Sequence, residues 1–137
     1  MDAAWTKAPD EARMRSVALG FCAGRAAIGS LAVLAPGLGS RILGFPAAHD
    51  NASARAAGRL FGIREVTLAG YTAVQVQRTP QQRDLYLANA AVDSADFAVL
   101  TLTFLGRRGI ARAAFTSALL AAPFAAAWLW LRGSCQD

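Results

Sequence analysis

The sequence predicts an all-α fold, an integral membrane four-helix up-and-down bundle that forms a single domain over residues 1–137. Hydrophobic residues make up 55% of the 137 residues, which is a high share for a soluble chain of this size. Four long apolar segments alternate with short polar turns. The charges inside these segments do not form the continuous outer stripe that a soluble helix needs, so we expect them to face inward and pair.

The first helix is expected at about residues 9–35. Pro9 and Glu11 favour a helix start there, because proline suits the first turn and an acidic side chain suits the positive end of the helix dipole. Gly20 and Gly24 form a GxxxG pattern. Small residues at this spacing let two helices approach closely in lipid.

The second helix is expected at about residues 51–78. Asp50 or Asn51 can cap its start, because short polar side chains accept hydrogen bonds from the first free backbone N–H groups. Gly58 and Gly62 form a second GxxxG pattern. We therefore expect the second helix to pack closely against the first.

The third helix is expected at about residues 80–105. Thr79 and Pro80, followed by Gln82, have the pattern of a capping box with proline at the first helical position. The sequence therefore predicts a sharply defined helix start at Pro80.

The fourth helix is expected at about residues 110–132. Most of this segment is uncharged, over a length close to the roughly 20 residues that cross a bilayer core. Trp128 and Trp130 lie near its end, as expected of an aromatic belt at the membrane interface.

Polar residues line one face of the third helix. Tyr86, Asn89, Asp93 and Asp96 are spaced so that they align on a helix. Their neighbours are Leu, Ala, Val and Phe, so the two carboxylates need partners from other helices. The first two helices carry the candidates, which are Arg25, Arg59, Arg64 and Glu65.

A helical rise of about 1.5 Å per residue places Arg25 and Asp93 at the same depth, roughly 12 Å below one surface. Arg64 lies on a helix that enters from the opposite surface, which places it near the depth of Asp96. Arg64 and Glu65 are adjacent and point about 100° apart, so we expect one to meet the first helix and the other the third. These five residues carry a formal charge of −1, which Arg59 would neutralise.

This cluster supports three functional hypotheses. In the first, it organises the bundle and binds the polar end of a lipophilic ligand through Arg25, Arg64, Arg59, Asn89, Tyr86 and Tyr71. In the second, the protein is a membrane-embedded acid/base enzyme, a cyclase, isomerase or epoxide-opening enzyme acting on a hydrophobic substrate, with Asp93, Asp96 and Glu65 as acid/base groups. In the third, it is a subunit of a membrane complex.

The expected partners are the lipid bilayer, a lipophilic small molecule and a second copy of the chain that docks through the GxxxG faces. Nucleic acid is not expected, because the 14 basic residues are scattered rather than clustered into a phosphate-binding patch. The sequence has one His, and its two cysteines, Cys22 and Cys135, are far apart. These residues do not have the spacing of a metal-binding site, so the sequence predicts neither metal nor cofactor.

Several short motifs resemble those of small bacterial four-helix membrane proteins related to the DoxX-like superfamily. They are Gly24-Arg25-x-x-Ile-Gly29, Arg59-Leu-Phe-Gly-Ile-Arg64-Glu65 and Asp93-x-x-Asp96, and the resemblance covers about residues 14–132. It implies four membrane helices and a polar core made of Arg25, Arg64, Glu65, Asp93 and Asp96. It also implies a multi-pass protein of the bacterial cytoplasmic (inner) membrane. Some DoxX-like proteins are linked to quinone or thiol redox chemistry, but this chain lacks a paired-cysteine motif.

Overall fold

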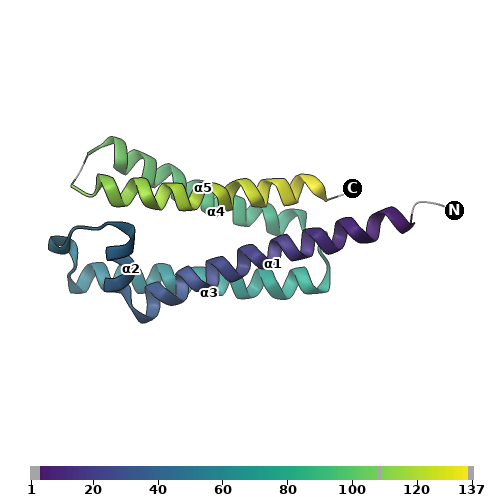
Figure 1. Cartoon of the computed structure of the whole chain (residues 1–137), viewed down its shortest axis with the longest axis horizontal. Coiled ribbons are helices and arrows are strands. Elements are labelled where there is room, and N and C mark those ends of the chain that lie inside the picture. Colours follow the sequence, from purple (N-terminus) through teal and green to yellow (C-terminus); the bar gives the residue numbers. More distant parts are fainter. Residues whose placement is uncertain (1–3, 108, 136–137) are drawn as a thin grey trace.

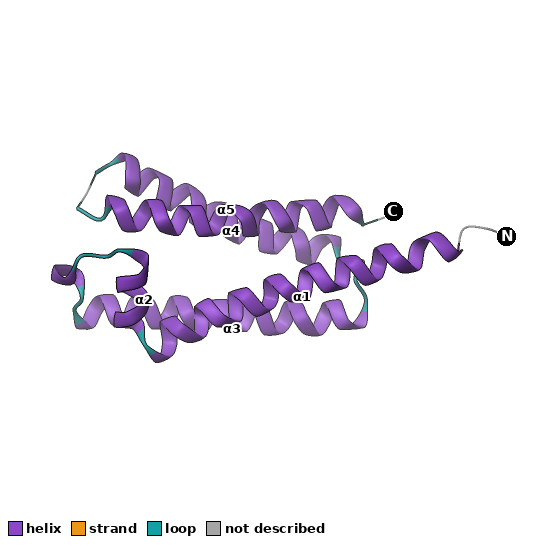
Figure 2. Ribbon diagram, in the orientation of Figure 1, coloured by secondary structure: helices purple, strands orange, loops and turns teal. Residues whose placement is uncertain are grey.

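A computed structural model describes residues 4–107 and 109–135, so positions 1–3, 108, 136 and 137 of the predicted domain lie outside the described residues. Within these ranges the chain is all-helical and has no strand, which confirms the all-α prediction (Figure 2). The elements are α1 (Ala4–Leu34), α2 (Pro36–Leu43), the 3-10 helix η1 (Ala47–His49), α3 (Ala52–Arg78), α4 (Arg83–Leu105) and α5 (Ala111–Ser134).

The four long helices are arranged as two pairs that lie one above the other (Figure 1). α1 packs along α3, and α4 packs along α5, whereas the backbones of the two pairs approach each other at few points. The start of α1 and the end of α5 lie at the same end of the molecule, and α2 and η1 lie at the other. Side chains rather than close backbone contacts therefore hold the two pairs together.

The tightest contact between α1 and α3 is formed by Gly29 and Gly62. A Cβ atom placed on Gly62 would lie 2.5 Å from the Gly29 carbonyl oxygen, and one on Gly29 would lie 2.7 Å from that of Gly62. The predicted close packing of these helices is therefore present, but the partner of Gly62 is Gly29. Gly24 faces Phe124 of α5 instead, and a Cβ atom placed on Gly20 would meet no described atom of another helix within 4 Å.

The connection between α1 and α3 contains two helical elements that the sequence did not predict, α2 and η1. α2 starts with proline and ends at Gly44, which adopts the left-handed conformation with φ of 86°. Glycine suits this position because it has no Cβ to clash there. α3 then starts as predicted, because the Asn51 side chain accepts a 3.0 Å hydrogen bond from the Ala54 N–H.

The predicted start of the third helix is wrong, since α4 begins at Arg83 rather than Pro80. Thr79 Oγ1 accepts a 3.3 Å hydrogen bond from Gln81 N–H, which closes a local turn in place of the capping box. The buried Tyr86 hydroxyl donates to the Pro80 carbonyl oxygen at 2.8 Å. This bond fixes the turn from α3 into α4. The other helix ends differ from prediction less, except that α1 already begins at Ala4.

The interior is built mainly from small and polar residues, and many large apolar side chains lie outside. Among the described residues, six buried core positions are alanines, namely Ala18, Ala69, Ala90, Ala113, Ala114 and Ala118. Exposed large apolar side chains occur along α3, α4 and α5, for example Leu60, Val99 and Leu119, and at the end of α1, where Leu34 is exposed. In the described part of the chain, three helices are long and apolar enough to cross a membrane: α1 from Glu11 to Leu34, α4 and α5.

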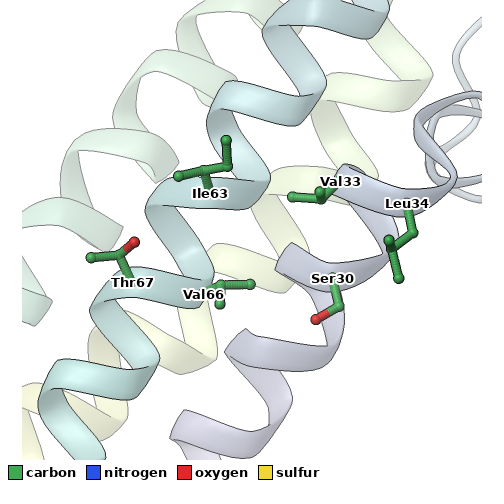
Figure 3. Close-up of a pocket in the computed structure, with 6 residues that line it drawn as sticks. All are labelled: Ser30, Val33, Leu34, Ile63, Val66 and Thr67. Atoms are coloured by element: carbon green, nitrogen blue, oxygen red, sulfur yellow. The ribbon is translucent and has the colours of Figure 1, made fainter.

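A shallow surface groove with a volume of about 290 Å³ runs between α1 and α3 (Figure 3). Its lining is mostly apolar, apart from the hydroxyl groups of one serine and one threonine. The lining residues are Ser30, Val33, Leu34, Ile63, Val66 and Thr67. None of the predicted ligand-binding residues lines this groove.

Candidate functional site

Arg25 of α1 occupies the centre of the molecule and is 1% exposed. Its Nη2 donates to Asp93 Oδ2 on α4. Its Nε lies 3.5 Å from Glu65 Oε2 on α3. Glu65 and Asp93 are themselves buried. The predicted pairing of Arg25 with Asp93 is therefore confirmed, and this one guanidinium group joins three helices.

The fourth long helix contacts Arg25 through its aromatic side chains. The guanidinium carbon lies 5.9 Å from the ring centroid of Phe124 and 6.0 Å from that of Trp128, both on α5. These distances are within the range of cation–π attraction, which strengthens when the groups are removed from water. Arg25 thus contacts every other long helix.

Arg64 of α3 forms the second half of the charged cluster. Its Nη1 donates to Asp96 Oδ1 at 3.2 Å, and its Nη2 donates to Asp96 Oδ2, so the pair has a bidentate geometry. Its Nε donates to Glu65 Oε1 at 3.0 Å. The two adjacent residues therefore contact different helices, as predicted. Arg64 contacts α4 through Asp96, and Glu65 contacts α1 through Arg25. The Arg64 side chain is 40% exposed, so the cluster reaches the surface here.

Glu65 links the two arginines and makes the cluster continuous. We call Arg25, Arg64, Glu65, Asp93 and Asp96 the charged cluster; its three carboxyl and two guanidinium groups give a formal charge of −1. Asp93 and Asp96 are bonded to different arginines. The arrangement therefore pairs each of these carboxylates with a guanidinium and does not pair them with each other.

Two of the residues predicted for the site lie on the surface, away from the charged cluster. Arg59 is exposed, and its Nε donates to the Val33 carbonyl oxygen at 3.3 Å. It therefore does not neutralise the cluster as predicted, because it lies more than a helical turn before Arg64 and reaches along α1. Tyr71 is 57% exposed on α3. Its ring faces outward and lines no polar pocket.

Asn89 and Tyr86 are buried next to the cluster, on the same side of α4 as Asp93. Asn89 Nδ2 donates to Thr72 Oγ1 on α3 and to the Leu85 carbonyl oxygen, each at 3.0 Å. The Tyr86 ring stacks on Trp128, with centroids 5.9 Å apart. Asn89 thus ties α4 to α3, whereas the Tyr86 hydroxyl is directed at Pro80 and not at the carboxylates.

Three residues of the site were not predicted from the sequence, namely Phe124, Trp128 and Thr72. The prediction that Trp128 belongs to an aromatic belt is wrong, because this side chain is fully buried. Trp130 is 45% exposed, as a belt residue would be. Phe124 and Trp128 are four residues apart, and this spacing could have indicated a shared inward face. No comparable signal marks Thr72, which lies in a long uncharged segment.

The fold and the site together define an all-helical protein with an arginine–carboxylate cluster at the meeting point of two helix pairs. Comparison with family models, with curated proteins and with solved structures finds no match to this chain. Among residues 4–107 and 109–135, no group of three or more His, Cys, Asp or Glu side chains is arranged to hold a metal ion.

Proposed function

We propose that the protein is a small integral membrane protein in which the four long helices form a bundle around the charged cluster. The cluster fixes the bundle and binds the polar end of a lipophilic ligand. The observation that carries this proposal is the position of Arg25, because its buried guanidinium group contacts α3, α4 and α5 at once.

The distribution of side chains supports the membrane setting. Many large apolar groups lie on the outside, while the interior combines alanines and polar groups with a few large apolar side chains, as expected where lipid rather than water surrounds the helices and small residues mediate packing. Exposed apolar surface of this extent is unusual in a soluble monomer. Within residues 4–107 and 109–135, three helices have the length and apolarity to span a membrane.

α3 is proposed as the fourth crossing, although its charges make it less apolar. Arg55 and Arg59 lie in its first third, within reach of a membrane surface. Arg64 and Glu65 lie near its middle, where ionisable groups are costly unless they pair inside the protein. Both are paired within the charged cluster, which removes the main objection to a span.

The acid/base enzyme is the second candidate, and the geometry favours it less. Acid catalysis by Asp93 and Asp96 would be helped if the two carboxyl groups shared a proton. Instead, each accepts hydrogen bonds from its own arginine. Glu65 is the carboxylate that contacts both arginines, so an acid/base role would more naturally involve Glu65 with Asp93.

Association through the GxxxG faces stays a prediction, and so does a role as a subunit of a membrane complex. Gly62 is used within the chain against Gly29, and Gly24 faces Phe124. Gly20 has open space around it and is the part of the first pattern left for a second copy. Kinship with the DoxX-like superfamily and residence in a bacterial inner membrane are proposed on the motifs and the apolar helices alone.

Two measurements test the proposal. Membranes from cells that express the full chain are washed with alkaline carbonate, and we expect the protein to stay in the membrane until detergent is added. The purified protein is then extracted with organic solvent, and the extract is analysed by mass spectrometry. Wild type should release a lipophilic compound that a folded Arg25→Lys variant lacks, whereas Arg59→Ala should retain it.

Recovery of the protein in the carbonate supernatant would overturn the membrane assignment. Equal amounts of every extracted compound from wild type and from folded Arg25→Lys would overturn the ligand-binding role and leave a purely structural cluster.

A further inference from the structure

Three buried side chains around Asp93 have polar atoms without a hydrogen-bond partner in the described part of the chain. They are Nη1 and Nε of Arg25, Oδ1 of Asn89 and Nε1 of Trp128, and these side chains are at most 2% exposed. Arg25 Nε lies 3.5 Å from Glu65 Oε2, which leaves the other three atoms without a charged partner of their own. A buried polar atom left without a hydrogen bond destabilises the folded state. A group of them in one place calls for a bound partner.

These atoms lie in the same part of the interior. Arg25 Nη1 belongs to the guanidinium group that is bonded to Asp93. The Trp128 indole N–H lies close enough to the Asp93 carboxyl group to interact with it, but the two groups do not meet hydrogen-bond geometry. Asn89 is four residues before Asp93 on α4, which places it about one helical turn away on the same face. We call these three atoms, with Asp93, the polar niche.

The chemistry of the polar niche specifies its occupant. Arg25 Nη1 and Trp128 Nε1 are donors, whereas Asn89 Oδ1 is an acceptor. A hydroxyl group accepts two hydrogen bonds and donates one, so it matches all three. A carbonyl oxygen could not donate to Asn89, and an ammonium group could not accept from the two donors.

The charge of the surroundings excludes an anionic occupant. The charged cluster already has one more carboxyl than guanidinium group. A carboxylate or phosphate in the niche would add negative charge in a low-dielectric interior, where unpaired charge is costly. A neutral hydroxyl group adds none.

We propose that the polar niche binds a neutral hydroxyl group, supplied either by a water molecule or by a lipophilic alcohol. This inference rests on the proposed ligand-binding function and specifies the ligand's polar end as an alcohol. The cluster reaches the surface at Arg64 and Asp96, one turn along α4 from Asp93.

The Trp128 indole N–H reports on the niche directly. The full chain carrying Trp5→Phe and Trp130→Phe retains only the Trp128 indole, whose ¹H–¹⁵N signal is recorded in detergent micelles. Farnesol is the probe, and farnesoic acid and the hydrocarbon farnesane are the matched controls. A dipolar cross-peak to water is recorded in the absence of any probe.

We expect farnesol to shift the Trp128 indole signal. Farnesol should also bind roughly tenfold or more tightly than either control, because one hydrogen bond to a charged or buried group changes the affinity by about this factor. Asn89→Leu should abolish this preference if the variant folds. A water cross-peak that farnesol does not displace also supports the hydroxyl niche and assigns its occupant to water.

Absence of both the water cross-peak and the farnesol shift would overturn the inference, as would equal shifts with farnesoic acid. These outcomes are independent of the carbonate wash and the solvent extraction. A protein that stays in membranes and releases a ligand with no hydroxyl group would leave the proposed function standing and the niche refuted.

Discussion

Arg25 and Asp93 form a buried ion pair across 68 residues of sequence, and this pair joins one helix pair to the other. α1 contributes the guanidinium group and α4 the carboxylate. The backbones of the two helix pairs approach at few points, so side chains make the connection, and this ion pair lies beside a buried apolar cluster to which all four long helices contribute.

Replacement of Arg25 should separate the effect of charge from that of shape. Arg25→Gln leaves Glu65 and Asp93 buried with no cation between them, and we expect a loss of about 3–5 kcal/mol in unfolding free energy. Arg25→Lys keeps the charge but lacks the planar fork that reaches both acids, so its loss should be intermediate. Unfolding in detergent measures both, with the exposed Arg15→Gln as the control, expected within about 0.5 kcal/mol of wild type. Equal stability of Arg25→Gln and Arg15→Gln would contradict the account.

The contact between α1 and α3 should not tolerate a methyl group. In Gly62→Ala the new Cβ would lie 2.5 Å from a backbone oxygen, and we expect destabilisation by about 1–3 kcal/mol. Gly70→Ala, on the same helix with nothing within 4 Å, should instead stabilise by up to about 1 kcal/mol. Thermal unfolding of the two variants side by side checks this difference. If both variants shift in the same direction, the close approach is not present.

The turn between α3 and α4 should depend on one hydroxyl group. Tyr86→Phe removes the 2.8 Å hydrogen bond to the Pro80 carbonyl oxygen and keeps the ring stacked on Trp128. We expect a loss of about 1 kcal/mol. Tyr71→Phe, at an exposed position of α3, is the matched control and should be neutral. Denaturant-induced unfolding monitored by circular dichroism distinguishes the two, and a neutral Tyr86→Phe would show that the bond is not formed.

The connection before α3 should respond to acid. The Asp50 carboxylate accepts hydrogen bonds of 2.7 and 3.0 Å from Arg55, and this bond lowers the pKa of Asp50. Because the pKa is lower in the folded state, the pair stabilises the protein fully at pH values above the unfolded-state pKa of about 3.9. This stabilisation is lost as the pH falls through the lower, folded-state pKa. An NMR titration of the Asp50 carboxyl should show this lowered pKa in wild type and a normal one in Arg55→Ala. The same pKa in both proteins would exclude the pair.

Much of the site could be predicted from sequence, because helical spacing fixes both direction and depth. The alignment of Asn89, Asp93 and Asp96 and the equal depth of Arg25 and Asp93 follow from the rise and turn of a helix. The adjacent Arg64 and Glu65 likewise had to face different partners.

What escaped prediction depends on how helices pack in three dimensions. Trp128 resembles an interfacial residue in sequence, but the Arg25 guanidinium group and the Tyr86 ring give it a buried setting. The prediction that Arg59 neutralises the cluster depends on its charge alone. Its position, five residues before Arg64 on α3, instead directs its side chain to the end of α1. The turn at Pro80 has a capping pattern, but the hydrogen bond from Tyr86 holds it outside the helix.

A double-mutant cycle of Arg25→Met and Asp93→Leu in detergent tests the central claim most directly. If the two side chains join the helix pairs, each single variant should be strongly destabilised and the double variant should recover part of the loss. The coupling energy should be about 2 kcal/mol or more. Effects that add to within about 0.5 kcal/mol would mean that the two residues do not meet and would contradict the account.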